Sequence, residues 1–107
     1  KNMQHTNYAN VVHSIATYNC KVIVAAQTFA LALATQNTYN KAVVQARKAL
    51  KQALKNDCKT HLQYTSFAVK QMQVAIKQHK NEMHFDALHT IVAAMLQRSS
   101  AVQYAYT

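Results

Sequence analysis

No glycine and no proline occur anywhere among the 107 residues of this chain. Glycine supplies the positive φ angles of tight hairpins and bulges, and proline presets the corners of many turns. A sheet protein of this length relies on such residues where its strands reverse, whereas both residues weaken a helix. Alanine, glutamine, lysine and leucine, which all favour helices, are abundant instead. We therefore expect an all-α fold.

The length and composition indicate one globular domain that covers residues 1–107. Half of the residues are hydrophobic and only 14% are charged, which argues against a disordered chain. The most apolar stretch, residues 22–34, is shorter than the roughly 20 apolar residues that a bilayer-spanning helix needs. We interpret this stretch as a buried helix of a soluble bundle.

Apolar residues that recur every three or four positions predict helices over about 7–36, 39–56, 58–80 and 82–105. Residues 37–40 favour a turn, and a break is expected near Asn56, where Asp57 would cap the next helix. An unbroken helix from Lys41 to Lys80 is the alternative. Asn81 is the expected N-cap of the last helix. The sequence thus predicts an antiparallel bundle of three to four helices.

The two cysteines, Cys20 and Cys58, lie equally far from Tyr39 in the predicted turn. An antiparallel hairpin centred there brings their sulfur atoms together and also pairs apolar residues: Val11 with Phe67, Ile15 with Leu62, and Phe29 with Leu50. We therefore predict a Cys20–Cys58 disulfide that staples the hairpin. Closing a loop of this length contributes about 4 kcal/mol in the chain-entropy model. The alternative is a pair of reduced, buried cysteines in an intracellular bundle.

A disulfide is stable in an oxidising compartment, so this pairing predicts a secreted, extracellular protein. The sequence begins with Lys1 rather than Met, which we interpret as the start of a processed chain. Within the hairpin, the segment from Val22 to Leu33 is apolar on nearly every side, and two helices alone cannot bury it. Either further helix of the same chain covers this end or a homodimer forms through it.

The charge of the chain is strongly unbalanced. Twelve lysines and arginines stand against three acidic residues, for a formal net charge of +9. Most of the basic residues recur at helical spacing within residues 41–80, where they have few acids to pair with. The simple interpretation is a solvated helix face, and the functional one is a surface that binds an anion or an acidic partner. The predicted binding residues are Lys41, Arg47, Lys48, Lys51, Lys55, Lys59, Lys70, Lys77 and Lys80.

These features predict a small secreted, non-enzymatic protein that binds an acidic protein or a polyanion, such as a sulfated glycan, in the manner of an inhibitor. A protein that coats or packages nucleic acid without sequence preference is the first alternative. A self-assembling structural subunit is the second. Binding to a membrane surface is less favoured, because the apolar helix faces are needed for the core of the protein itself.

Residues for catalysis or metal binding are sparse. Cys58 and His61 are spaced for a thiolate–imidazole pair beside Asp57, but the disulfide with Cys20 explains Cys58 better, and a place beside the helix interface explains His61 better. Three acids leave little scope for paired-carboxylate chemistry, and a glycine-rich phosphate loop needs glycine. The six histidines show none of the usual metal-ligand spacings. We therefore expect no enzyme activity, no cofactor and no metal site.

Overall fold

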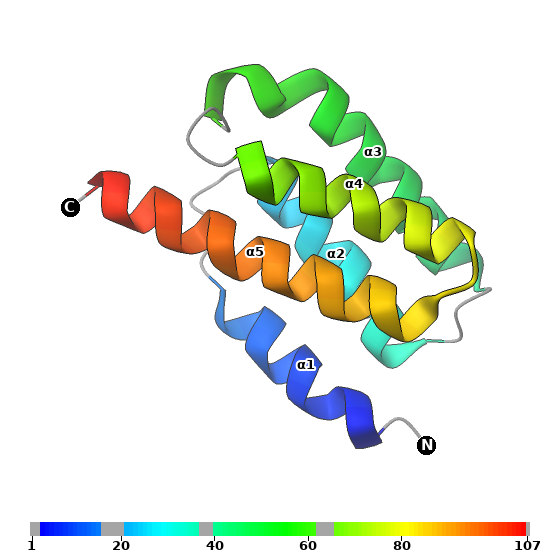
Figure 1. Cartoon of the computed structure of the whole chain (residues 1–107). Helices are drawn as coiled ribbons and strands as arrows, with labels where there is room; N and C mark the ends of the chain where they lie inside the picture. The colour runs from blue at the N-terminus through cyan, green and yellow to red at the C-terminus, as the bar shows by residue number, and fades with distance from the viewer. Residues whose placement is uncertain (1–2, 16–20, 37–39, 62–65, 107) are drawn as a thin grey trace.

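The computed structural model describes the backbone of residues 3–15, 21–36, 40–61 and 66–106, and the side chains of residues 8–15, 21–36, 40–56 and 68–97. Within these ranges the chain forms helices and no strand, as Figure 1 shows. The all-α prediction is confirmed. The helices are α1 (Met3–Ser14), α2 (Lys21–Thr35), α3 (Lys41–His61), α4 (Ser66–Lys80) and α5 (His84–Tyr106).

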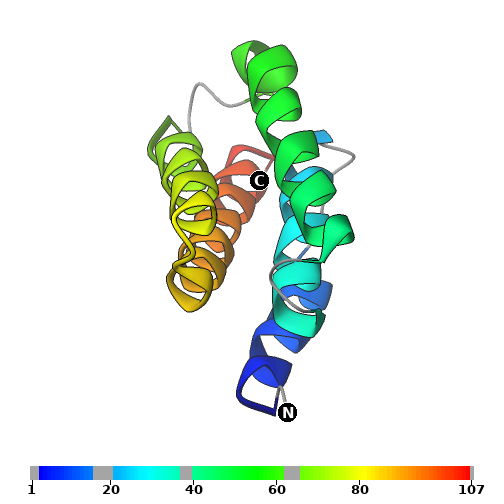
Figure 2. The same cartoon turned by 90° about the vertical axis from the view of Figure 1, so that its right-hand side faces the viewer.

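Two helical hairpins pack against each other. Helices α2 and α3 form one hairpin and α4 and α5 form the other, and the two hairpins lie in separate layers (Figure 2). Helix α1 lies against α2 and α5. The layers touch closely where α2 meets α5 but only at a few places where α3 meets α4. The side of the bundle between α3 and α4 is therefore its more open side.

The predicted single helix over residues 7–36 is wrong, because the chain reverses between α1 and α2. The Nε2 atom of Gln27 in α2 donates a hydrogen bond to the carbonyl oxygen of Val12 in α1, at 2.9 Å. In one continuous helix these residues would lie about 22 Å apart. The reversal lets α1 cover the apolar α2, and Val12 and Ile15 become buried in the process.

Helix α3 begins at Lys41, directly after the residues 37–40 that the sequence predicts to form a turn. The side-chain oxygen Oδ1 of Asn40 accepts a hydrogen bond from the backbone N–H of Ala42, at 2.8 Å, and so caps the helix. Phe29 and Leu50, paired in the predicted register, are both fully buried in one core. The partners predicted for Val11 and Ile15, by contrast, have side chains outside the described ranges.

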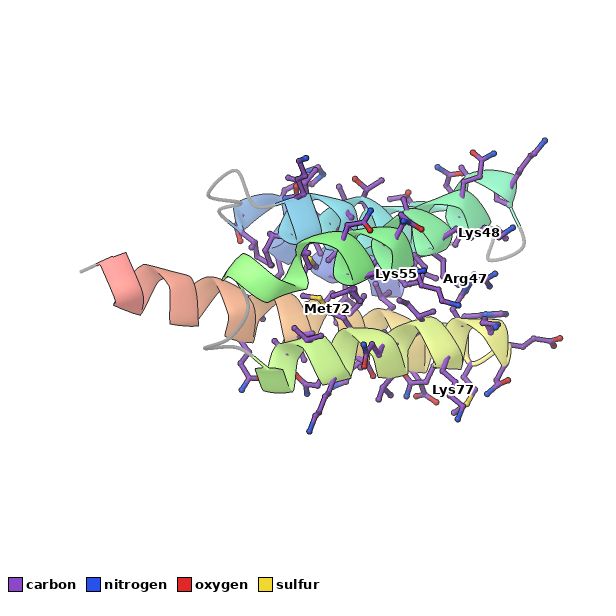
Figure 3. The ribbon with its side chains drawn as sticks, turned by 90° about the horizontal axis from the view of Figure 1, so that it is seen from above. Arg47, Lys48, Lys55, Met72 and Lys77 are labelled. Atoms are coloured by element: carbon purple, nitrogen blue, oxygen red, sulfur yellow. The ribbon has the colours of Figure 1, made fainter. Side chains whose placement is uncertain are left out.

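The predicted break near Asn56 is wrong, because α3 continues to His61 and contains both Asn56 and Asp57. The unbroken helix to Lys80 is also excluded. It would be about 60 Å long, whereas the longest dimension of the molecule is 40 Å. Helix α4 instead returns alongside α3, and Figure 3 shows the two helices side by side.

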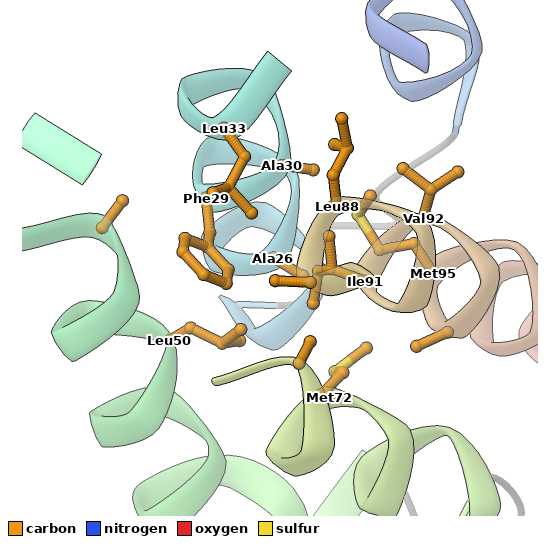
Figure 4. Packing of buried hydrophobic residues seen from close by; sticks show 14 of the residues in the cluster. Ala26, Phe29, Ala30, Leu33, Leu50, Met72, Leu88, Ile91, Val92 and Met95 are labelled. Carbon is orange, nitrogen blue, oxygen red and sulfur yellow. The ribbon is translucent and has the colours of Figure 1, made fainter. Parts of the chain in front are cut away.

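One hydrophobic core joins α2 to the other helices. Phe29 of α2, Leu50 of α3, Met72 of α4 and Ile91 of α5 are all fully buried and converge in Figure 4. The apolar segment from Val22 to Leu33 is thus covered by helices of the same chain. This removes the packing need that suggested a homodimer through this segment, and the dimer itself stays a prediction.

The α4–α5 turn is built without glycine. Glu82 adopts a left-handed backbone with φ of 65°. Its N–H donates to the carbonyl of His79 at 3.0 Å, and the N–H of Met83 donates to that of Gln78 at 2.9 Å. These two bonds form a Schellman motif that ends α4. Asn81 therefore closes α4 rather than capping α5, which corrects the prediction made for it.

Candidate anion-binding groove

The basic residues predicted to form a binding face lie on two helices. Lys41, Lys48, Lys51 and Lys55 are exposed on α3, and Arg47 is half-buried there. Helix α4 carries the exposed residues Lys70, Lys77 and Lys80. Lys59 belongs to α3, but its side chain lies outside the described residues.

The reversal between α3 and α4 brings four of these lysines around one groove. The groove has a volume of about 640 Å³ and opens between the two helices. Figure 3 shows Lys55 on α3 and Lys77 on α4, the helix beside it. We call it the lysine groove and define it by its lining residues, which are Lys51, Leu54, Lys55, Gln73, Ile76, Lys77 and Lys80.

The floor of the lysine groove is apolar and its rim is cationic. Leu54 and Ile76 reach it from opposite helices, and both are more than 90% buried. The lysines add their aliphatic stems to this lining, while a lysine on an exposed rim keeps its ammonium group in water. None of the described residues that line the groove is acidic. The groove therefore combines hydrophobic surface with uncompensated positive charge.

One end of the lysine groove is held by a contact between α3 and α4. The Nη1 atom of Arg47 donates a hydrogen bond to Nδ1 of His79, at 3.2 Å. An arginine can only donate, so Nδ1 acts as the acceptor and His79 carries its ring proton on Nε2. His79 is 5% exposed, and its ring meets the edge of Phe29 with 5.5 Å between the ring centres. We call this contact the Arg47–His79 clasp.

The clasp lies close to most of the groove lysines. Arg47 precedes Lys51 by one helical turn, and His79 is next to Lys80 in sequence and two residues after Lys77. Lys55 lies two turns from Arg47 along α3. Lys51 and Lys80 are therefore the groove lysines next to the clasp along their helices, and the guanidinium of Arg47 adds positive charge at this end.

The acids of the protein lie elsewhere or cannot be placed. Glu82 and Asp86 are exposed in the α4–α5 turn and the first turn of α5, and the side chain of Asp57 lies outside the described residues. Asp86 lies in the first turn of α5, where the helix dipole favours a negative charge.

A second, smaller groove lies between α1 and α5. It has a volume of about 260 Å³ and an almost purely apolar lining. At its rim the hydroxyl of Tyr8 and Nδ1 of His89 are joined by a hydrogen bond of 2.8 Å. The groove has neither the charge nor the depth of the lysine groove. Its lining residues are Tyr8, Val11, His89, Val92, Ala93 and Leu96.

The structure describes only some of the other residues for which the sequence suggested a role. The side chains of Asp57, Cys58 and His61 and all of Cys20 lie outside the described residues, so the predicted disulfide stays a prediction. In the part of the chain that is described, no group of three or more His, Cys, Asp or Glu side chains gathers as a metal-ligand set. Among the helices searched over the same ranges, none is long and apolar enough to cross a membrane.

Comparison with known proteins adds no relative to this picture: no protein-family model, curated protein or solved structure matches the chain. The geometry and charge of the lysine groove are therefore the features that indicate a function.

Sequence reasoning identified the four groove lysines but not the groove itself. It gave Leu54, Gln73 and Ile76 no role in the binding site. The groove forms only because α4 reverses direction beside α3, and the sequence placed that reversal several residues too early. The Arg47–His79 clasp joins residues 32 positions apart, and no spacing pattern in the sequence predicts this contact.

Proposed function

We propose that this protein is a non-enzymatic binding protein that holds an anionic partner against the lysine groove. The observation that carries the proposal is the convergence of Lys51 and Lys55 from α3 with Lys77 and Lys80 from α4 around a groove whose described lining includes no acid. Lysines on an ordinary solvated face extend separately into water. Here they surround a concave surface with a low-dielectric floor, which concentrates the electrostatic potential and attracts anions.

The wider lysine face supports the same proposal. Lys41, Lys48 and Lys70 are exposed near the groove on the same two helices, so an extended anion meets further positive charge beyond the rim. With a net charge of +9, the whole protein attracts anions over a Debye length of about 8 Å at physiological ionic strength. An acidic protein and a sulfated glycan fit this surface, and an extracellular setting follows if Cys20 and Cys58 are bonded.

The test is retention on immobilised heparin at physiological salt, with a groove variant and a charge-matched control. The groove variant carries Lys51→Gln, Lys55→Gln, Lys77→Gln and Lys80→Gln. The control carries Lys21→Gln, Lys41→Gln, Lys48→Gln and Lys70→Gln, which are exposed lysines outside the groove. Both variants lose the same charge, and glutamine is nearly as good a helix former as lysine.

We expect the native protein to be retained, the control to be retained less tightly, and the groove variant to elute in the flow-through. Equal loss of retention by both variants would show that overall charge, rather than the groove, determines binding. Elution of the native protein in the flow-through would contradict the proposal as a whole. A parallel titration with double-stranded DNA examines the packaging alternative, which predicts binding at least as tight as to heparin.

A further inference from the structure

The lysine groove has a chemical character that a purely hydrophilic polyanion does not match. Its floor is made by Leu54 and Ile76, and its walls by lysine stems, so most of the lining is hydrocarbon. A sulfated glycan that pairs with the ammonium groups leaves the lysine stems, and the small exposed part of Leu54 and Ile76, facing water. An uncharged apolar molecule covers the floor but leaves the ammonium groups without a counter-charge. The lining matches a molecule with one apolar body and one anionic end.

The size of the groove favours a small amphiphile, rather than an acidic helix of a partner protein, as its ligand. A volume of about 640 Å³ lies within the range of roughly 300–1,000 Å³ that is usual for small-molecule sites. The lining covers residues 51–55 of α3 and 73–80 of α4, which is only about 6 and 10 Å of helix axis. A helix docked in a groove needs a row of apolar pockets and about 800 Å² of contact on each partner. Two apolar floor residues do not make such a row.

We infer that the lysine groove binds a single long-chain fatty acid as its carboxylate, an inference that rests on the proposed anion-binding function of the same groove. The carboxylate lies at the clasp end, where Lys51, Lys77 and Lys80 are close to the Arg47–His79 clasp. The first part of the alkyl chain lies over Leu54 and Ile76 and runs toward Lys55 and Gln73, and the far end of a long chain projects beyond the groove lining. Binding buries the chain against hydrocarbon, while the lysines hold the charge at the rim.

The experiment measures displacement of a dansyl-labelled undecanoic acid from the full-length protein by hexadecanoate, below the concentration at which the fatty acid aggregates. We expect hexadecanoate to displace the probe and hexadecanol, which has the same chain without the charge, to be at least about tenfold weaker. Hexanoate, which keeps the carboxylate and loses most of the chain, should displace little. Equal displacement by hexadecanoate and hexadecanol would overturn the inference.

Two pairs of variants locate the ligand. Lys77→Gln with Lys80→Gln removes charge at the clasp end and should weaken hexadecanoate binding about three- to tenfold. The charge-matched pair Lys41→Gln with Lys70→Gln should change it less than about twofold. Gln73→Trp places a large side chain at an exposed position in the groove and should block binding, whereas Gln52→Trp, exposed on α3 outside the groove, should not. Equal effects within either pair would place the fatty acid elsewhere and overturn the inference.

These experiments distinguish failure of the fatty-acid inference from failure of the proposed anion-binding function. Heparin retention that depends on the groove lysines, without any displacement by hexadecanoate, would overturn the fatty-acid inference and leave the anion-binding function in place. An acidic amphipathic peptide that displaces the probe better than hexadecanoate would overturn the inference in favour of a protein partner. Absence of both heparin retention and probe displacement would contradict the two together.

Discussion

The guanidinium of Arg47 donates a hydrogen bond to Nδ1 of the buried His79 and so links α3 to α4. Helices α3 and α4 meet at few other places, so this bond ties the two helices together, and the ring contact between His79 and Phe29 holds α4 against α2. Arg47 belongs to the predicted binding face, yet one of its N–H groups faces inward. The residue therefore supports the lysine groove as well as contributing charge to it.

Replacement of Arg47 by alanine should destabilise the fold by about 1–2 kcal/mol, because the buried Nδ1 of His79 loses this donor. Lys48→Ala is the matched control, since Lys48 is the next residue and is exposed; it should change the free energy of unfolding by less than about 0.5 kcal/mol. Urea denaturation followed by circular dichroism measures both variants. If the two variants unfold at the same urea concentration, the clasp does not stabilise the bundle.

Gln27 should anchor α1, because its side-chain amide donates to the carbonyl of Val12 in the last turn of that helix. We expect Gln27→Leu to cost about 1 kcal/mol and to speed amide hydrogen exchange in α1 more than in α4 or α5. Thr28→Val is the control, because the Thr28 hydroxyl bonds only to Val24 within α2. Uniform acceleration across all helices would mean that the bond has no special role in holding α1.

The helical class was predictable because it depends on local features: the absence of glycine and proline, and the period of apolar residues such as Val43, Leu50 and Leu54. The helix boundaries were less predictable for the same reason. In most chains glycine and proline mark where a helix ends, and here those markers do not exist. The chain reverses between α1 and α2 without either residue, and Glu82 takes the left-handed position that glycine usually occupies.

The candidate site shows the same division between local and long-range information. The spacing of Lys51 and Lys55 on one helix face is a local pattern, and it is visible in the sequence. Their approach to Lys77 and Lys80 depends on where α4 turns back, which is decided by how α2 and α5 pack in the core. The sequence therefore indicates a cationic face, and the fold makes part of it concave.

The predicted Cys20–Cys58 disulfide has a direct test. Intact mass measured without reductant should be two hydrogens lower than after reduction, and the bond should add about 4 kcal/mol to the free energy of unfolding. The double variant Cys20→Ser and Cys58→Ser serves as the control and should show no change in stability on adding reductant. Equal masses before and after reduction would remove both the staple and the main reason to expect an extracellular protein.

Glu82 offers a site where glycine should stabilise the protein. Its φ of 65° places a side chain in the left-handed region, which costs about 1–2 kcal/mol for a residue with a Cβ atom. Glycine removes that cost but gains freedom in the unfolded chain. The net expectation is that Glu82→Gly is more stable than Glu82→Ala by about 0.5–1 kcal/mol. The alanine variant is the proper reference, because it loses the same carboxylate and keeps the Cβ atom.

Thermal and urea denaturation of these two variants, measured side by side, decide the point. The hydrogen bonds from Glu82 to His79 and from Met83 to Gln78 are made by the backbone, so neither substitution removes them. A gain confined to the glycine variant identifies backbone strain in the α4–α5 turn. Equal stability of the two variants would show that the turn is held without strain, and a gain shared by both would point to the lost negative charge instead.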